Sequence, residues 1–179
     1  RREMVRRAEP NAGHYALAEL EDLLPRVVVV TQNVDNLHQR AGSTDIIPLH
    51  GAILRSKCAA GCRGEPTVIE ATAPSGGDLP RCPHCGALAR PDVVWFGENL
   101  PVDVLMRAMV VTQQADVMLV VGTSGVVQPA AGLPALARRA GATVIEINSI
   151  SSAITPLAAI WLAGPAGEVL PQVVAAIRA

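Results

Sequence analysis

Two aliphatic runs constrain the fold of this chain more than any other feature of its sequence. Residues 27–30 and 117–121 have no polar residue at every second position, so both are expected to be strands buried on two faces, as in parallel sheets. The second run is followed by a glycine-rich turn, a helical stretch at residues 133–140 and another aliphatic run at 143–147. This order predicts a right-handed βαβ unit. We therefore expect an α/β fold with a doubly wound, Rossmann-like parallel sheet.

The composition changes between residues 51 and 92, where glycines, prolines and all four cysteines gather. We predict that residues 51–92 form a small inserted module and that residues 1–50 and 93–179 form one discontinuous Rossmann-like domain. In residues 1–24 the apolar positions follow a helical period that is broken at 10–13. Two helices are therefore expected before the first strand.

The four cysteines form two pairs, Cys58 with Cys62 and Cys82 with Cys85, separated by 19 residues. This spacing resembles that of a zinc ribbon, in which four thiolates complete a closed tetrahedral site. We predict a structural zinc ion here. A disulfide is the weaker alternative because nothing suggests secretion, and His84 is expected to be a turn residue because four thiolates are available. Five basic and four acidic residues leave the module a charge of only +1, which argues against a nucleic-acid-binding ribbon.

Polar residues follow four of the aliphatic runs. In a parallel sheet these positions share one edge, where ligands bind. Each has a simpler explanation by itself: a helix cap, a core histidine or a tight turn. Together they predict one shared site, although residues 122–125 lack the G-x-G-x-x-G pattern of dinucleotide-binding loops. The polar residues are Gln32, Asn33 and Asp35, then His50, then Gly122, Thr123 and Ser124, then Asn148 and Ser149.

Several segments together resemble one family, the sirtuins, which are NAD-dependent protein-lysine deacylases. They are TQNVDNLHQRAG at 31–42, LHG at 49–51, the cysteine pairs, RPDVVWFGE at 90–98 and GTS at 122–124. The resemblance covers nearly the whole chain. It implies NAD and zinc as cofactors, and it adds an NAD-binding role to the Rossmann-like domain.

The resemblance also implies roles for individual residues. His50 would be the catalytic general base, which suits an imidazole that is largely neutral at pH 7. A second group would contact NAD: Gln32, Asn33, Val34 and Asp35 at the nicotinamide and ribose, Gly122, Thr123 and Ser124 at the phosphate and ribose, Asn148, Ser149 and Ile150 at the adenosine, and Ala166 near the adenine. A third would pair as a strand with an acyl-lysine peptide: Val94, Trp95, Phe96, Gly97 and Glu98 on one side, Val126 and Val127 on the other.

The implied reaction gives a free lysine, nicotinamide and 2′-O-acyl-ADP-ribose. The opening residues resemble the branch acting on succinyl- and malonyl-lysine, in which Arg1 would bind the substrate carboxylate; a solvated helix face is the simpler interpretation. The family's Gly-Ala-Gly-x-Ser loop, which binds the NAD pyrophosphate, is expected upstream of this chain. ADP-ribosyl transfer and an inactive zinc-bearing scaffold are the alternatives.

The expected partners are acyl-lysine proteins or peptides. With 15 basic and 16 acidic residues the formal charge is −1, which gives no reason to expect nucleic acid or an anionic membrane as a partner. The N-terminus has no apolar segment of a secretory signal, and we expect a cytoplasmic protein.

Overall fold

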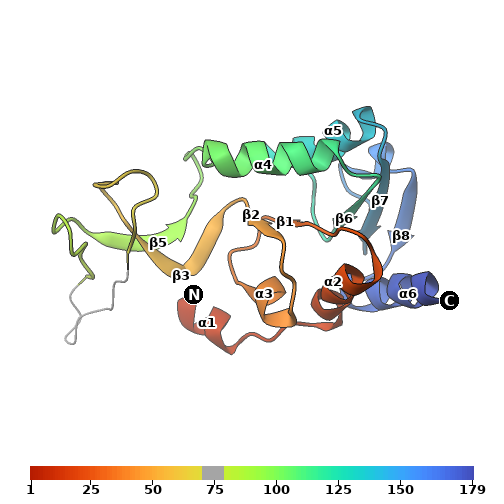
Figure 1. Ribbon diagram of the computed structural model, residues 1–179, viewed down its shortest axis with the longest axis horizontal. Helices are drawn as coiled ribbons and strands as arrows, with labels where there is room; N and C mark the ends of the chain where they lie inside the picture. The colour runs from red at the N-terminus through yellow and green to blue at the C-terminus, as the bar shows by residue number, and fades with distance from the viewer. Residues whose placement is uncertain (70–78) are drawn as a thin grey trace. The chain divides into compact units, whose positions relative to one another are not determined.

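The structure is a computed structural model that describes residues 1–69 and 79–179 (Figure 1). Its contacts divide the chain into two compact units, which are described separately. Unit 1 contains Arg1–Ala8, Thr31–Asn36 and Pro48–Pro101, and unit 2 contains Glu9–Val30, Leu37–Ile47 and Val102–Ala179. The boundaries predicted for the inserted module stay a prediction.

The helices of the described residues are α1 (Arg2–Arg7), α2 (Ala12–Leu23), α3 (Leu37–Ala41), α4 (Val102–Gln113), α5 (Leu133–Arg139) and α6 (Ala166–Arg178), with short 3-10 turns η1 (Ala130–Gly132) and η2 (Thr155–Leu157). The strands are β1 (Val29–Thr31), β2 (Ile46–Pro48), β3 (Gly51–Cys58), β4 (Val68–Ile69), β5 (Ala89–Val93), β6 (Val117–Val121), β7 (Thr143–Asn148) and β8 (Ile160–Ala163).

Unit 2 contains a parallel sheet in the order β6-β7-β8. Strand β6 pairs with β7 from Val117 opposite Thr143 to Val121 opposite Ile147, and α5 connects the two strands. The predicted βαβ unit is therefore confirmed. Because all three strands run the same way, their carboxyl ends meet at one edge of the sheet.

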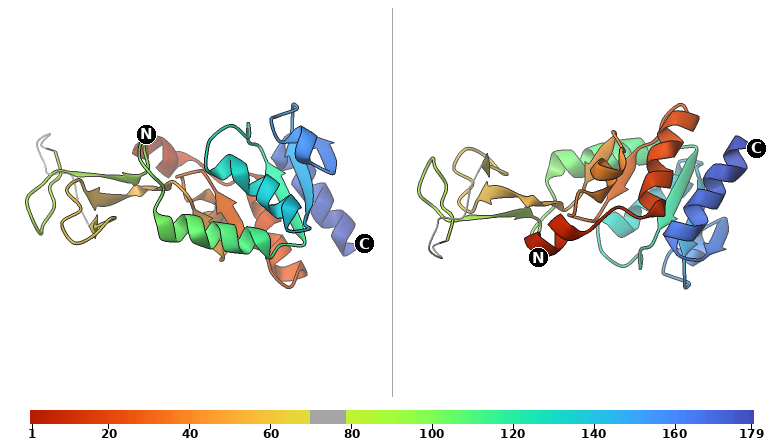
Figure 2. Two further views of the ribbon diagram at one scale, coloured as in Figure 1. Left: turned by 90° about the horizontal axis from the view of Figure 1, so that it is seen from above. Right: turned by 90° about the horizontal axis from the view of Figure 1, so that it is seen from below.

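Both faces of this sheet are covered by helices, as a doubly wound fold requires. Along β6, Met118 and Val120 pack in the cluster that contains Ala137 of α5, whereas Leu119 and Val121 pack with residues of α2 and α6. This alternation follows from the two-residue period of a strand. Figures 1 and 2 show α2 and α6 side by side on one face and α5 on the other.

The first predicted strand is shorter than its aliphatic run suggests. The hydrogen bonds between β1 and the segment that contains β2 begin at Val29, whose N–H donates to the Asp45 carbonyl. They continue at Thr31, whose carbonyl accepts the Leu49 N–H. Val27 instead packs against the core formed with α2 and α6. The break between the first two helices lies two residues earlier than predicted, at 8–11, because α1 ends at Arg7 and α2 begins at Ala12, behind an Asn11 side chain that caps the Gly13 and His14 N–H groups.

In unit 1, β3 is the central strand of an antiparallel sheet in the order β4-β3-β5. The pairing of β3 with β5 shifts register between Ala52 and Ser56, which marks a bulge. Across the described residues of both units, no helix combines the length and apolar character needed to span a membrane.

Candidate active site and metal centre

The four cysteine sulfur atoms of unit 1 lie within 4.8 Å of one another. The Sγ atoms of Cys58 and Cys85 are 3.6 Å apart, and those of Cys62 and Cys82 are 3.8 Å apart. A zinc ion with Zn–S bonds of about 2.3 Å requires sulfur separations of about 3.8 Å. The observed separations therefore fit one tetrahedral zinc ion. His84 is not in the cluster, and its backbone N–H points to the Cys82 sulfur, in agreement with its predicted place in a turn.

The thiols strongly influence one another's protonation. A backbone hydrogen bond from Cys62 lowers the pKa of the Cys58 thiol to about 6. Desolvation and the neighbouring thiols raise the pKa of Cys62 to about 12. Four thiolates this close together need a cation, so metal binding must release protons. The zinc affinity is consequently expected to fall as the pH falls.

The His50 side chain is half-buried, and its Nδ1 atom lies 3.1 Å from the carbonyl oxygen of Gln32. A carbonyl oxygen can only accept, so this contact places the imidazole proton on Nδ1. The Nε2 atom then has a free lone pair. His50 is thus held in the tautomer that can take up a proton at Nε2.

The backbone of His50 and Gly51 is attached to the end of β5 and to Val94, which follows it. The Val94 N–H donates to the His50 carbonyl over 3.0 Å, and Gly51 pairs with Val93. Gly51 has φ +80°, and a Cβ atom there would lie 2.2 Å from the Asp92 carbonyl oxygen. Only glycine allows this close approach. The candidate base and the start of segment 94–98 are therefore fixed to each other.

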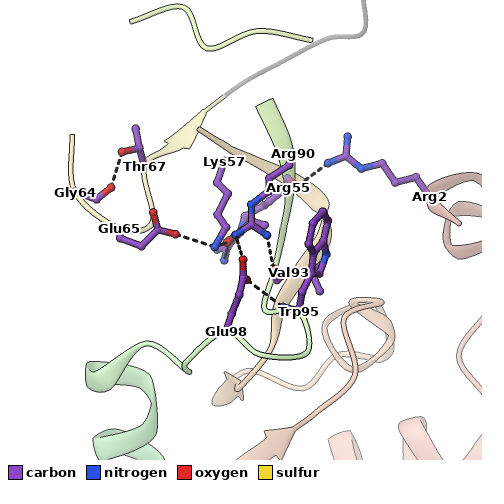
Figure 3. A network of polar contacts seen from close by, with 11 residues as sticks. Arg2, Arg55, Lys57, Gly64, Glu65, Thr67, Arg90, Val93, Trp95 and Glu98 are labelled. Atoms are coloured by element: carbon purple, nitrogen blue, oxygen red, sulfur yellow. Dashed lines mark hydrogen bonds and ion pairs between the residues drawn. The ribbon is translucent and has the colours of Figure 1, made fainter. Parts of the chain in front are cut away.

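Figure 3 shows how the segment 94–98 is held. The Arg90 guanidinium binds Glu98 at 2.6 Å, donates to the Val93 carbonyl and lies over the Trp95 ring at 4.8 Å. Glu98 also accepts the Trp95 N–H, and this bond together with Arg90 keeps the pKa of Glu98 below its ordinary value despite its desolvation. Phe96 is fully exposed. The segment is thus anchored at both ends, with Phe96 free at its tip.

A second set of charged contacts links β3 to β5 and to the loop after β3. The buried Asp92 carboxylate binds Arg55 and lies 3.9 Å from the buried Lys57 ammonium. Lys57 in turn binds Glu65 at 2.8 Å (Figure 3). Arg2 donates to the carbonyls of Ile53 and Arg55 and to the Ser56 hydroxyl. Arg1, by contrast, is exposed and makes no side-chain cap to α1.

The remaining candidates of unit 1 lie in the turn after β1. The Asn33 N–H donates to the Thr31 hydroxyl, and the Val34 carbonyl accepts the Ile53 N–H over 2.8 Å. Asp35 is half-buried. Beside it, the buried side-chain oxygen of Asn36 has no hydrogen-bond partner among the described residues.

In unit 2, two loops meet at the carboxyl edge of the sheet. The Asn148 side-chain amide donates to the Thr123 carbonyl over 2.9 Å. Gly125 packs so closely that a Cβ atom would lie 2.5 Å from the Ile154 side chain, whereas Gly122, at φ +59°, faces open space. This opening fits the close approach of a phosphate or ribose to the backbone. The other candidates here are the exposed Ser124, Val126, Val127, Ser149 and Ile150, and Ala166 in the first turn of α6.

A family model described as "Sir2 family" matches residues 1–129. The chain belongs to the Sir2 family. This sirtuin is 51% identical over 177 residues to an NAD-dependent protein deacylase of Pyrococcus abyssi, and the match covers 97% of this chain and 70% of the relative.

Solved structures agree with this assignment. A Sir2 homologue in complex with NAD is 48% identical, with a TM-score of 0.91 over 98% of this chain and 68% of that one. A Sir2–p53 peptide–NAD+ structure is 35% identical, with a TM-score of 0.86 over 97% and 72%. The predicted family and fold are therefore confirmed, and the protein is an enzyme of the sirtuin type whose four clustered cysteines fit a zinc site.

Some residues that shape this sirtuin's site were not singled out from the sequence. In the sequence, Gly51 is one residue of the LHG motif and Glu146 lies within an aliphatic run. The sequence does carry a signal for Glu146, because this residue is the one charge in the aliphatic run that contains Val144, Ile145 and Ile147. In the sequence, Arg90 is one basic residue of the module and the first residue of the RPDVVWFGE segment. Its contact with Trp95 had no sequence signal.

Replacing Gly51 by alanine is expected to lower the free energy of unfolding by more than about 2 kcal/mol, because the new Cβ meets backbone and φ is left-handed. Chemical denaturation measures the change. Gly141→Ala is the matched control, since Gly141 has φ +102° but open space around its Cβ position. Equal losses in the two variants would show that the contact with Asp92 is unimportant.

Proposed function

We propose that this sirtuin removes acetyl, succinyl and malonyl groups from protein lysines, releasing nicotinamide and 2′-O-acyl-ADP-ribose. The observation that carries the proposal is the tautomer of His50, fixed by the Gln32 carbonyl so that Nε2 can accept a proton. NAD, when bound, supplies the ribose to which the acyl group is transferred. His50 takes the proton from that ribose as general base, a step that typically contributes 10²- to 10⁴-fold to the rate.

The remaining roles are proposals for this chain's own residues. Gln32, Asn33, Val34 and Asp35 bind the nicotinamide and its ribose, and the residues at 122–124, 148–150 and 166 bind the rest of the dinucleotide. The peptide pairs by its backbone with Val94 to Glu98 and with Val126 and Val127. The anchoring of Val94 to His50 and of Trp95 to Arg90 supports this assignment, because a segment held in place binds a peptide at lower entropic cost.

The test is to incubate the protein with NAD and acetyl-, succinyl- or glutaryl-lysine peptides and to identify all products by mass spectrometry. We expect free lysine peptide, nicotinamide and O-acyl-ADP-ribose in equal amounts. ADP-ribose attached to protein or peptide, with the acyl group retained, would indicate a transferase instead. If no product forms and calorimetry detects no NAD binding, the protein is an inactive scaffold.

For the acyl group, we propose that Arg1 binds the carboxylate of succinyl- or malonyl-lysine. Arg1→Met is expected to raise KM for a succinyl-lysine peptide roughly 10- to 100-fold, since a hydrogen bond between charged groups is worth about 1.5–3 kcal/mol, and to leave KM for acetyl-lysine unchanged. Arg6→Met is the control, because Arg6 is exposed on the helix that follows Arg1 and forms an ion pair with Glu3. Turnover of acetyl-lysine by the wild type as fast as succinyl-lysine would contradict the role of Arg1.

A further inference from the structure

A buried carboxylate lies beneath the adenosine end of the proposed cofactor site. Glu146 of β7 is completely buried among aliphatic residues. Its Oε1 accepts from the Ser152 hydroxyl at 2.5 Å and lies 3.4 Å from the Asn148 Nδ2 atom, and its Oε2 accepts from the Thr155 hydroxyl at 2.5 Å. These donors are neutral. The reaction proposed above gives Glu146 no role.

Glu146 keeps its negative charge at neutral pH. Burial raises the pKa of this carboxyl group, but the hydrogen bonds from Ser152, Thr155 and Asn148 outweigh burial and leave it below the ordinary value. The sequence contains no lysine or arginine from Thr143 to Ile177. Among the described residues, the hydrogen bonds to this carboxylate come from neutral donors, and the segment that contains β7 and β8 supplies no basic residue.

The same contacts fix the orientation of the Asn148 amide. The Thr123 carbonyl and the Glu146 carboxylate can only accept hydrogen bonds, so both are bound by the Nδ2 side of Asn148. The backbone of Asn148 is fixed as well, since its carbonyl accepts from the Trp161 indole at 3.0 Å and from the Gly164 N–H at 3.2 Å. The Oδ1 atom remains, and Asn148 presents an acceptor at the carboxyl end of the central strand.

A dinucleotide at this edge would bring its adenosine ribose to the end of β7. A ribose hydroxyl can donate to the Asn148 oxygen. A 2′-phosphate offers no donor in its ionised form, carries a charge of about −1.5 to −2 and would face an acceptor with a carboxylate behind it. Proteins that accept the 2′-phosphate place an arginine nearby, which this segment does not contain.

We infer that Glu146 and Asn148 determine the cofactor selectivity of this sirtuin, admitting NAD and rejecting NADP. Asn148 acts by direct contact and Glu146 acts through it, by orienting the amide and by its charge. The inference rests on the proposed binding of NAD at this edge. The inference gives Glu146, which is not proposed to contact the cofactor or the peptide, a role in selecting the cofactor.

Calorimetric titration of NAD and NADP into the folded protein tests the inference. The wild type is expected to bind NADP at least tenfold more weakly than NAD. The side chain in Glu146→Gln has nearly the same shape but no charge. The dissociation constant for NADP divided by that for NAD should therefore fall about tenfold in this variant, mainly because NADP binds more tightly. Ser152→Ala removes one donor but keeps the charge, so its ratio should stay that of the wild type.

Two further variants make the test independent of how well Glu146→Gln folds. Glu19→Gln removes the same charge from an ion pair with Arg178, at the opposite end of α6 from Ala166, and should leave the ratio unchanged. Ile150→Arg places a cation two residues after Asn148 at a position that is 74% exposed, and should tighten NADP binding at least tenfold and so lower the ratio of the NADP to the NAD dissociation constant.

Equal wild-type affinities for NAD and NADP would overturn the inference, as would an unchanged ratio in both Glu146→Gln and Ile150→Arg. Such results would leave the proposed deacylation intact, because NAD would still bind. If the wild type binds neither dinucleotide, the proposed function itself fails, and the selectivity fails with it.

Discussion

Replacing His50 by alanine is expected to lower kcat for deacylation by about 10²- to 10⁴-fold, because no other side chain is proposed to take the ribose proton. The dissociation constant for NAD should change by less than threefold, since the base acts after binding. Steady-state assays with an acyl-lysine peptide measure the first quantity, and calorimetry measures the second.

His50→Asn is the sharper variant. The asparagine amide can still donate to the Gln32 carbonyl, as Nδ1 of His50 does over 3.1 Å, but it has no basic nitrogen at the position of Nε2. The kcat of His50→Asn should therefore fall by the same factor as that of His50→Ala. If His50→Asn retained more than about a tenth of the wild-type kcat, the role of His50 would be positional and the general-base assignment would be wrong.

Removing zinc should unfold the cysteine module. Structural zinc sites contribute on the order of 10–16 kcal/mol of apparent binding free energy at pH 7, far more than a small module can otherwise gain. Cys58→Ser is expected to abolish zinc retention and to lower the melting temperature, since Cys58 is both a ligand and part of the buried cluster with Ile69 and Cys82. Zinc content by elemental analysis and thermal unfolding by circular dichroism are the measurements.

His84→Ala is the matched control for the metal site. His84 lies between Cys82 and Cys85 in sequence but outside the cluster of four sulfur atoms, so this variant should keep one zinc per chain. Loss of zinc from His84→Ala, or its full retention in Cys58→Ser, would contradict the four-cysteine assignment. Zinc release should also become easier at lower pH, because the thiolates must take up protons as the metal leaves.

Local spacing allowed the metal site and the sheet to be predicted without coordinates. Two short cysteine pairs constrain four thiolates strongly, because each pair already holds its sulfur atoms about one turn apart. The aliphatic runs at 117–121 and 143–147 likewise identified β6 and β7, because a fully buried parallel strand tolerates few polar residues. The residues at which β1 begins and ends could not be predicted from the aliphatic run, because a valine such as Val27 can pack against helices as well as it can pack within a strand.

The sequence alone determined the family and the α/β fold and identified the four cysteines and His50 as candidates, because each depends on residue types at short, regular spacings. The tautomer of His50 was decided only by the tertiary structure, which brings its ring to the Gln32 carbonyl. The same is true of the contact between Gly51 and Asp92 and of the orientation of Asn148 by Glu146 and Thr123. The physical reason is that hydrogen bonds and close contacts depend on ångström-scale positions, which chain segments far apart in sequence acquire only after folding.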